Sequence, residues 1–307
     1  MKGLVVKSTG SWYKIRKDDG EIVDARTRGK LRTVGIKSTN PVAVGDHVEI
    51  SQRSEGDWSI DDLSDRKNYI IRKATKLSKQ THIVAANMDL AIVLVTLMQP
   101  KLKLGFLDRM LVTTEAYNIP TIIVFNKVDV LSADERQYLN DLCKAYKDVG
   151  YDSLQISVLT GEGIDQVKER IEGKTTVISG HSGVGKSSLL NTLNPSFNAR
   201  VTDVSDFNEK GQHTTTFAEL FEVNDTTFII DTPGLKSFGL ISMDREELKD
   251  YFPEMHRLSE NCKFYNCLHI NEPGCAVKPA YEQSQLPWFR YENYLHLYEE
   301  LKGLELK

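Results

Sequence analysis

The glycine-rich segment at residues 180–187 has the composition of a phosphate-binding loop. Its letters, GHSGVGKS, fit the pattern G-x-x-x-x-G-K-[ST] between an apolar run and a helix-like run. Glycines let successive backbone N–H groups converge on phosphate oxygens, and a helix N-terminus favours the anion. Lys186 is expected to reach the β- and γ-phosphates, and the Ser187 hydroxyl to bind Mg²⁺. The residues predicted to contact a nucleotide here are Gly180, His181, Ser182, Gly183, Val184, Gly185, Lys186, Ser187 and Ser188.

A second motif, with the letters NKVD at residues 126–129, predicts which base is bound. The Asp129 carboxylate can accept hydrogen bonds from N1–H and the exocyclic amine of guanine, a pair of donors that adenine lacks. The stem of Lys127 can lie on the base plane, and Asn126 can tie loops together. Ser157 occupies the place of a further base-supporting motif, although a plain turn at the end of a strand also explains it. The chain is therefore predicted to bind GTP.

The segment with the letters DTPG at residues 231–234 follows another apolar run. Asp231 is expected to hold Mg²⁺ through water, and the Gly234 N–H to contact the γ-phosphate, so that the order of this loop depends on GTP. The next residue, Leu235, stands where many GTPases place a glutamine that orients water. Because leucine cannot do so, hydrolysis needs another group, and unassisted turnover is expected to be slow.

The segment with the letters GQHTTT at residues 211–216 is predicted to be the first switch loop, because it also precedes a strand-like run. Thr215, or otherwise Thr214, is expected to complete the Mg²⁺ shell. His213 is a candidate to position or deprotonate water, since a loop histidine with a near-neutral pKa can do either. The alternative is that His213 only shapes the loop.

Three of the four cysteines lie close together, with a histidine among them. The spacing Cys262-x4-Cys267-x-His269-x5-Cys275 supplies three thiolates and one imidazole, a set typical of structural zinc. All four positions come from the protein, which leaves no place for a catalytic water. The predicted role is therefore to fold a loop-rich segment. Cys143 stands alone in a helix-like stretch and is expected to be a small buried residue.

The elements that must position the nucleotide motifs are alternating strands and helices between residues 86 and 240. Continuous apolar runs are typical of strands buried on both faces, and ligands of such sheets bind at the carboxyl ends of the strands. Ser132 and Glu135 form a capping-box pattern that predicts a helix. We predict an α/β P-loop GTPase domain over residues 86–240. The apolar runs are residues 90–95, 121–125, 175–179 and 226–230.

Short strand-like runs separated by turn signals fill residues 1–75 and predict a small β-barrel of the OB-fold type. Residues 1–79 carry 17 Lys or Arg against 11 Asp or Glu, whereas the whole chain has 39 against 43. A basic first segment is expected to face a polyanion, although a solvated surface of mixed charge also explains it. The basic, polar stretch at 65–82 is interpreted as a connecting segment or arm, with the linker ending near residue 85.

The remaining residues, 241–307, predict an α-helical zinc-binding domain that ends in a helix over 292–304. No apolar run of about eighteen residues predicts a membrane span. The first residues are too quickly polar for a signal peptide. The expected location is therefore the cytoplasm, with no membrane partner.

The motifs occur in a rotated order along the chain. The base-reading motif at 126–129 precedes the phosphate loop at 180–187, whereas an ordinary small GTPase begins with the phosphate loop. A binding site is defined in space, so the site can still assemble. The order therefore predicts a circularly permuted GTPase domain.

With this order, and with the letters EPGCAV at 272–277 closing the cysteine set, the chain resembles the circularly permuted ribosome small-subunit-dependent GTPases, the RsgA or YjeQ family. The resemblance implies a monomer that binds the 30S subunit and its 16S rRNA and acts in late maturation of that subunit. It also implies GTP hydrolysis stimulated by the subunit. The chain departs from the family at His181, where proline is frequent, and at Val158-Leu159, where alanine-lysine is usual.

Two rival hypotheses use the same residues differently. The first is an RNA-binding assembly factor whose nucleotide site is mainly structural and barely hydrolyses, for which Leu235 is the best support. The second is an ATP-dependent enzyme, which requires that Asp129 play no part in choosing the base.

Overall fold

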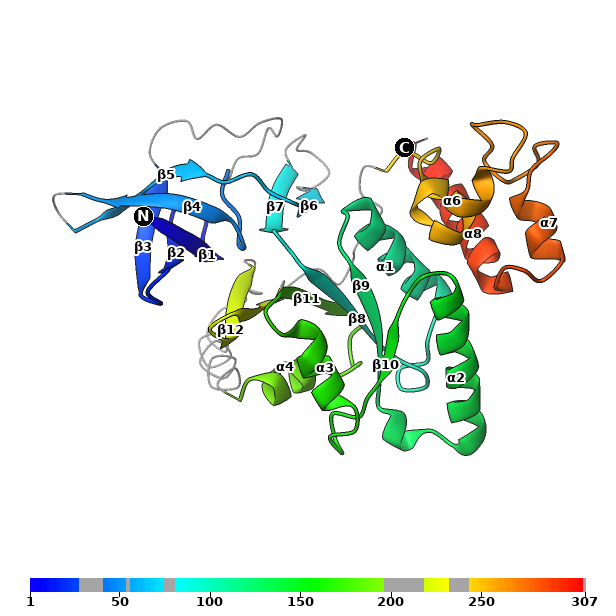
Figure 1. Ribbon diagram of the computed structural model, residues 1–307, viewed down its shortest axis with the longest axis horizontal. Helices are drawn as coiled ribbons and strands as arrows, with labels where there is room; N and C mark the ends of the chain where they lie inside the picture. The colour runs from blue at the N-terminus through cyan, green and yellow to red at the C-terminus, as the bar shows by residue number, and fades with distance from the viewer. Residues whose placement is uncertain (28–40, 54–55, 74–80, 196–217, 232–242, 306–307) are drawn as a thin grey trace. The chain divides into compact units, whose positions relative to one another are not determined.

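The computed structural model describes residues 1–27, 41–53, 56–73, 81–195, 218–231 and 243–305 (Figure 1). The chain divides into two compact units that interleave along the sequence. The first unit is Met1–Ile92, Ile164–Gly180 and Gly185–Ser237. The second unit is Val93–Gly163, His181–Val184 and Phe238–Lys307.

A five-stranded β-barrel opens the first unit. Strand β1 pairs with β2 and β4, β2 with β3, β3 in parallel with β5, and β4 with β5, which closes the ring. Alternate residues of each strand face inward, where Val5, Tyr13, Ile15, Ile50 and Ile60 form a buried core. The predicted OB-fold barrel is therefore confirmed. The strands are β1 (Lys2–Ser8), β2 (Tyr13–Lys17), β3 (Ile22–Thr27), β4 (His47–Gln52) and β5 (Trp58–Leu63).

The stretch interpreted as a connecting segment contains two paired strands instead. Strands β6 (Tyr69–Lys73) and β7 (Thr81–Ala86) form an antiparallel ladder. The reason is apolar burial, because Ile70 and Ile83 are buried despite their basic neighbours. Arg66, just before β6, donates hydrogen bonds of 2.7 and 2.6 Å to the buried Asp46 carboxylate of the barrel. The stretch predicted to connect the two domains therefore contains a β-ladder of its own.

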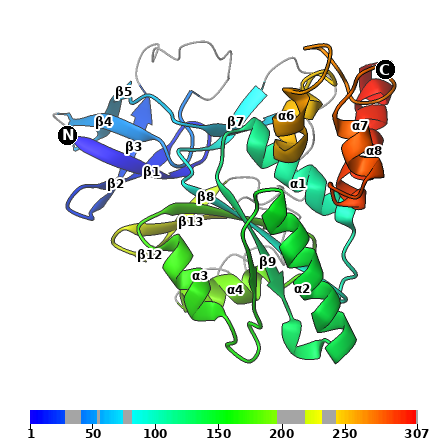
Figure 2. The ribbon, with the colours of Figure 1, turned by 45° about the vertical axis from the view of Figure 1, so that its right-hand side comes forward.

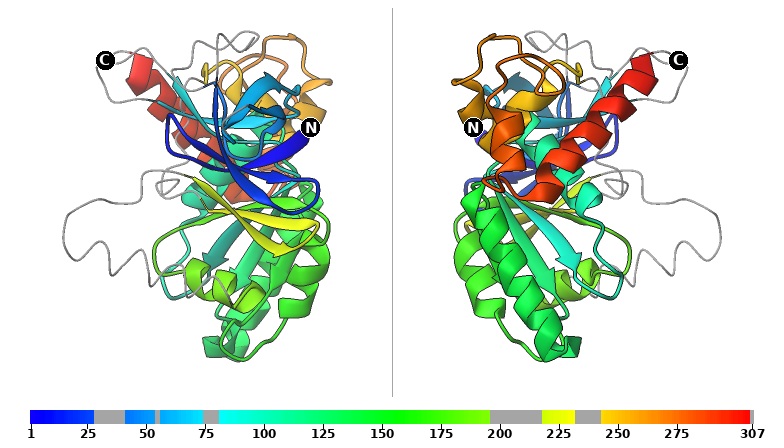
Figure 3. Two further views of the ribbon diagram at one scale, coloured as in Figure 1. Left: turned by 90° about the vertical axis from the view of Figure 1, so that its left-hand side faces the viewer. Right: turned by 90° about the vertical axis from the view of Figure 1, so that its right-hand side faces the viewer.

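The α/β part of the first unit contains three strands that lead back to the barrel. Strand β11 is parallel to β13, which is antiparallel to β12. Strand β12 then pairs antiparallel with β1 of the barrel, with Lys7 opposite Glu219 (Figure 3). The elements are α3 (Ile164–Ile171), β11 (Thr175–Gly180), α4 (Lys186–Leu193), β12 (Glu219–Asn224) and β13 (Thr227–Asp231).

The second unit holds the base-reading part of the α/β domain. Strands β9 and β10 are parallel, while β8 begins in the first unit and ends in the second. The predicted capping box is present, since Ser132 Oγ accepts from the Glu135 N–H and Glu135 Oε2 accepts from the Ser132 N–H. The elements are β8 (Leu90–Thr96), α1 (Leu104–Ala116), β9 (Thr121–Asn126), η1 (Val128–Val130), α2 (Ala133–Asp148) and β10 (Ser153–Gln155).

Helices form the C-terminal part of the second unit and pack beside α1 (Figure 2). Phe252, Met255, Tyr294 and Leu297 form a buried cluster that includes Val112 of α1. The last helix begins at Trp288, directly after Pro287 and four residues before the predicted start. None of the described helices is long and apolar enough to cross a membrane. The elements are η3 (Leu248–Tyr251), α6 (Pro253–Ser259), α7 (Val277–Glu282) and α8 (Trp288–Glu305).

A buried ion cluster fastens these C-terminal helices to α1. Arg290 of α8, fully buried, donates to Asp108 Oδ1 of α1 at 2.6 Å and to Glu254 Oε1 of α6 at 2.6 Å. The Asp108 carboxylate also accepts from the Tyr146 hydroxyl and the Asn293 amide. Burial raises the pKa of Asp108, and the Arg290 charge opposes that rise. The cluster therefore depends on the arginine to keep two buried carboxylates partnered.

We expect an Arg290→Met protein to lose about 3–5 kcal/mol of unfolding free energy, because two buried carboxylates lose their cation. Urea unfolding followed by tryptophan fluorescence measures the loss. The matched control is Arg109→Met, since Arg109 joins α1 to Glu300 of α8 at the surface and is expected to contribute about 0–1 kcal/mol. Equal losses in the two proteins would contradict the assignment of the stability to the buried cluster.

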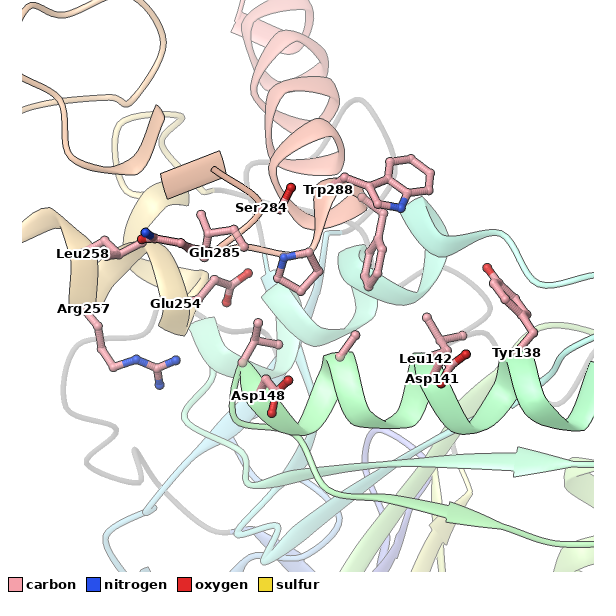
Figure 4. A pocket seen from close by; sticks show the side chains of 15 residues that line it. Tyr138, Asp141, Leu142, Asp148, Glu254, Arg257, Leu258, Ser284, Gln285 and Trp288 are labelled. Carbon is pink, nitrogen blue, oxygen red and sulfur yellow. The ribbon is translucent and has the colours of Figure 1, made fainter. Parts of the chain in front are cut away.

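An open groove of about 590 Å³ lies between α2, α6 and the turn before α8 (Figure 4). Leu142, Val149, Leu286 and Phe289 give it an apolar wall, and the side chain of Trp288 is exposed at its edge. None of the residues that line this groove belongs to the predicted nucleotide or metal motifs. The groove is therefore separate from the candidate site.

Candidate nucleotide-binding and metal sites

Asn126 links the phosphate loop to the loop after β10, within the second unit. Its side chain is buried at the end of β9. Its Nδ2 donates to the Val184 carbonyl at 2.8 Å, and its Oδ1 accepts from the Val158 N–H at 3.2 Å. The residue thus holds together two loops that lie more than twenty residues apart in the sequence.

Lys127 makes a second connection to the phosphate loop. Its backbone is left-handed, with φ of 63°, which turns the chain sharply after β9. Its ammonium donates to the Gly183 carbonyl at 2.8 Å and to the Gln99 carbonyl at 2.9 Å. Asp129 follows in η1 and is half-buried, and its carboxylate has no hydrogen-bond partner among the described residues. Its oxygens are therefore available to a ligand.

Ser157 lies in the loop after β10 and is fully buried. Its Oγ accepts from the Thr160 N–H at 3.1 Å, so the hydroxyl stabilises its own turn. The Asn126 side chain meets this loop at the Val158 N–H, which places the turn beside the base-reading motif. Val158 and Leu159 stand where alanine and lysine are usual in the family. This difference leaves the contact with Asn126 in place, because the contact uses the backbone N–H of Val158 and no side chain of either residue.

The phosphate loop joins β11 to α4. Gly183 and Gly185 have φ of 83° and 98°, a conformation that L-residues with side chains rarely adopt. Lys186, the first residue of α4, donates from Nζ to the Gly180 carbonyl at 2.7 Å within the first unit. Ser187 and Ser188 are exposed in the first turn of α4, where the backbone N–H groups of a helix lack intrahelical partners. This loop therefore has the geometry of an anion-binding helix N-terminus.

The exposed His181 side chain packs against α1. Its ring meets the Phe106 ring edge-on, with centroids 5.5 Å apart and an angle of 75° between the planes. Its Nδ1 lies 3.3 Å from the carbonyl oxygen of the exposed Ser182. The aromatic contact was not predicted from the sequence, because it depends on a residue of α1 that has no motif of its own.

The magnesium and switch residues are described only in part. Asp231 is half-buried at the carboxyl end of β13 and, like Gly180 at the end of the parallel strand β11, lies at the ligand-binding edge expected of the sheet. The other predicted residues lie outside the described ranges. They are His213, Thr214, Thr215, Gly234 and Leu235.

The structure brings the four predicted metal ligands together. The ligand atoms of Cys262, Cys267, His269 and Cys275 all lie within 4.8 Å of one another. His269 Nδ1 is 3.7 Å from Cys262 Sγ and 3.6 Å from Cys275 Sγ. A tetrahedral site with ordinary zinc–sulfur and zinc–nitrogen bonds would separate these atoms by about 3.6 Å. The four residues can therefore hold one metal ion, with Nδ1 as the histidine ligand.

The protonation of this cluster also suits a cation. Burial lowers the pKa of His269 to about 4, so its imidazole is neutral at pH 7 and keeps a lone pair for a metal. Burial also raises the pKa of the Cys267 thiol to about 12 in the absence of a cation. A coordinated metal ion reverses that rise, because it favours the thiolate.

Groups outside the four ligands hold the metal-binding loop in shape. The Glu272 carboxylate accepts from the N–H groups of Leu268, Ile270 and Asn271 at 2.9–3.0 Å. The Tyr291 hydroxyl donates to the His269 carbonyl at 2.7 Å. These supporting groups were missed in the sequence, although the position of Glu272 between two ligands was the available signal.

Two family models match the chain. The RsgA N-terminal domain matches residues 2–60, and the RsgA GTPase matches residues 63–241, more than half of the chain. The chain belongs to the RsgA GTPase family. The N-terminal RsgA match covers the barrel up to the middle of β5, and the GTPase match covers every nucleotide motif named above.

Curated RsgA proteins match over nearly the whole length. The small ribosomal subunit biogenesis GTPase RsgA of Bacteroides fragilis is 49% identical over 300 residues, which is 98% of this chain and 97% of that protein. The protein of the same name from Christiangramia forsetii is 47% identical over 302 residues, with 97% and 96% covered.

Solved structures of related proteins have the same fold. YjeQ from Thermotoga maritima superposes with a TM-score of 0.80 at 33% identity, and 98% of each chain is covered. YloQ, described as a circularly permuted GTPase, superposes with a TM-score of 0.77 at 29% identity, with 98% of this chain and 95% of YloQ covered. The predicted permuted architecture is therefore confirmed.

Proposed function

We propose that this protein binds the small (30S) ribosomal subunit during its late maturation and hydrolyses GTP to GDP and phosphate, with stimulation by the subunit. One observation carries the proposal within an RsgA GTPase fold. Asn126 and Lys127 of the base-reading motif hydrogen-bond to Val184 and Gly183 of the phosphate loop, although the two motifs are about fifty residues apart in the sequence. The names of the relatives support the ribosomal partner.

In this proposal, the Asp129 carboxylate selects guanine, Ser157 supports the base, and the N–H groups of residues 180–188 bind the phosphates. Lys186 contacts the β- and γ-phosphates, and the Gly234 N–H contacts the γ-phosphate. Mg²⁺, when bound with GTP, neutralises charge that develops on the phosphates. The residues assigned to hold it are Ser187, Asp231 and Thr215.

We assign zinc to the Cys262, Cys267, His269 and Cys275 cluster. Three thiolates and one imidazole are the donor set that zinc favours, and the atom separations match its tetrahedral bond lengths. The role assigned to the metal is structural, because the protein fills all four positions.

The barrel is the proposed contact for 16S rRNA, but several of its described cations already face acidic groups. Lys7 pairs with Glu219, and Lys17 pairs with Asp19. Other features support the RNA contact. Arg26 lies 3.5 Å above the exposed Trp12 ring, an arrangement able to stack on a base, and residues 28–40 carry further lysines and arginines. The same proposal describes the protein as a monomer in the cytoplasm.

The alternative function is an RNA-binding assembly factor with a mainly structural, barely hydrolysing nucleotide site. Leu235 favours it, because leucine cannot orient an attacking water. The two functions differ in one measurable way. A catalytic GTPase accelerates on adding small subunits, whereas a structural nucleotide site does not.

We expect small subunits to raise the GTP hydrolysis rate of the wild-type protein, and His213→Ala to lower the stimulated rate about a hundredfold, because a general base is typically worth that much. Phosphate release at saturating GTP, with and without purified subunits, measures both. A flat rate on adding subunits would favour the alternative function. A His213→Ala rate equal to that of the wild type would leave His213 with a loop-shaping role only.

A further inference from the structure

Glu222 of β12 is a junction of three elements in the first unit. Its carboxylate accepts two hydrogen bonds from Arg16 of the barrel strand β2. Arg16 Nε donates to Oε2 at 3.1 Å, and Arg16 Nη2 donates to Oε1 at 3.3 Å. Its backbone carbonyl accepts from the side chain of Asn194, at the end of α4, at 2.5 Å. Helix α4 begins in the phosphate loop at Lys186. Glu222 therefore connects the helix of the phosphate loop to the barrel.

The hairpin that contains Glu222 also joins, along the chain, the predicted first switch loop at 211–216 and the segment at 231–234, whose order is predicted to depend on GTP. Strand β12 begins three residues after the segment 211–216, and β13 ends at Asp231, the first residue of the segment 231–234. A hairpin held in one place fixes the start of β12 and the end of β13, which adjoin both segments in the sequence. Its anchorage therefore bears on the geometry of hydrolysis.

Arg16 is placed to provide that anchorage. Its side chain is only 16% exposed, and it makes a paired hydrogen bond with Glu222, a geometry that is both strong and directional. The same guanidinium lies 3.7 Å from Asp225 and over the Phe228 ring of β13. Both strands of the hairpin, and the turn between them, thus meet one barrel side chain.

A second contact keeps the barrel and the hairpin in register. Lys7 lies opposite Glu219 in the β1–β12 pairing, and their side chains form an ion pair at 2.9 Å. An unpaired sheet edge exposes backbone groups that another strand can satisfy. Here β1 pairs with β12 at Glu219, the first residue of β12.

We propose that Arg16 is a positioning residue for GTP hydrolysis, acting through Glu222 on the β12–β13 hairpin. The inference rests on the proposed function, since it concerns the rate of the same reaction. Arg16 touches no nucleotide in this proposal. Its loss removes one of the contacts that hold the hairpin, while Asn126, Lys127 and the phosphate loop keep their own contacts.

The expected result for Arg16→Ala is a fall of about tenfold in the subunit-stimulated kcat, because small displacements of catalytic groups are costly in rate. The KM for GTP is expected to change by less than about twofold, since the base-reading contacts are untouched. The reciprocal protein Arg16→Glu/Glu222→Arg restores the pair with opposite polarity. It is expected to recover most of the lost kcat.

The test measures kcat and KM for GTP with saturating small subunits in the full-length protein. The matched control is Lys14→Ala, because Lys14 lies on the same strand β2, carries the same charge and faces Asp24 of β3 instead of the hairpin. A weaker attraction of the barrel to RNA would affect both proteins alike. A second variant, Glu222→Gln, keeps the shape of the side chain. It is used for the test if the Arg16→Ala protein does not fold.

A lower kcat for Arg16→Ala and Glu222→Gln but not for Lys14→Ala, with recovery in the reciprocal protein, supports the positioning role. Equal rates for Arg16→Ala and Lys14→Ala, or a loss expressed only in KM, would overturn it. Failure of the proposed function looks different, because the wild-type protein itself would then show no subunit-stimulated hydrolysis.

Discussion

A Lys186→Ala protein is expected to hydrolyse GTP about a hundred- to a thousandfold more slowly than the wild type, because one charged contact to the developing negative charge is typically worth that much. The Lys186 ammonium already donates to the Gly180 carbonyl at 2.7 Å, so it is held at the predicted phosphate loop. Alanine removes the charge and leaves the backbone of the loop in place. Single-turnover hydrolysis with saturating small subunits measures the loss.

The control for this substitution is Lys174→Ala. Lys174 precedes β11, and its side chain donates to the Arg170 carbonyl at 2.7 Å. Lys174→Ala therefore removes an equal charge from the start of the strand that leads to the phosphate loop. It is expected to hydrolyse GTP at the wild-type rate. Unfolding curves that match for both variants separate a catalytic loss from a folding defect. Undiminished GTP hydrolysis by a folded Lys186→Ala protein would contradict the assignment of the phosphate loop to the proposed site.

The elements with strong local patterns were predictable from the sequence. The apolar run at 90–95 became the buried strand β8, and the capping pattern at Ser132 and Glu135 started α2 as expected. In both cases the signal lies within a few residues and does not depend on distant partners. The grouping of Cys262, Cys267, His269 and Cys275 was predictable for a similar reason, because all four lie within fourteen residues of one another in the sequence.

Features that depend on distant partners were not predictable. The basic stretch around β6 and β7 has the composition of a linker, yet burial of Ile70 and Ile83 makes it a ladder. A composition count also could not show that Arg16 faces Glu222, about 200 residues away. The basic surplus of the first segment therefore overstates the charge available to the proposed RNA partner, because acidic groups of the same chain already pair with part of it.

The carbonyl partners of Lys127 show the same limit within the nucleotide site. The motif itself predicts a lysine beside the base, but the contact with Gln99 comes from a loop that contains no recognisable motif. Backbone carbonyls carry no residue identity, so a sequence pattern does not reveal them. Gln99 supports the base-reading motif through its backbone carbonyl, and its side chain plays no part in this contact.

Replacing Cys267 by alanine is expected to abolish stable zinc binding and to lower the melting temperature of the C-terminal helices. Structural zinc contributes apparent binding energies of about 10–16 kcal/mol in small zinc-finger peptides, so loss of one ligand is costly. Cys267 is the most buried of the three thiols, and the loop around it has few apolar side chains of its own. Zinc content by elemental analysis, with thermal unfolding before and after chelator treatment, measures both effects.

Cys143→Ala is the matched control, because Cys143 is a half-buried thiol in α2 that lies outside the four-ligand cluster. It is expected to keep one zinc per chain and to melt with the wild type. Chelation should lower the melting temperature of the wild type and of Cys143→Ala, yet leave Cys267→Ala unchanged. A Cys267→Ala protein that retains one zinc per chain would contradict the ligand assignment. Full zinc loss without any change in melting would instead contradict its structural role, since the loop would then hold its shape through Glu272 and Tyr291 alone.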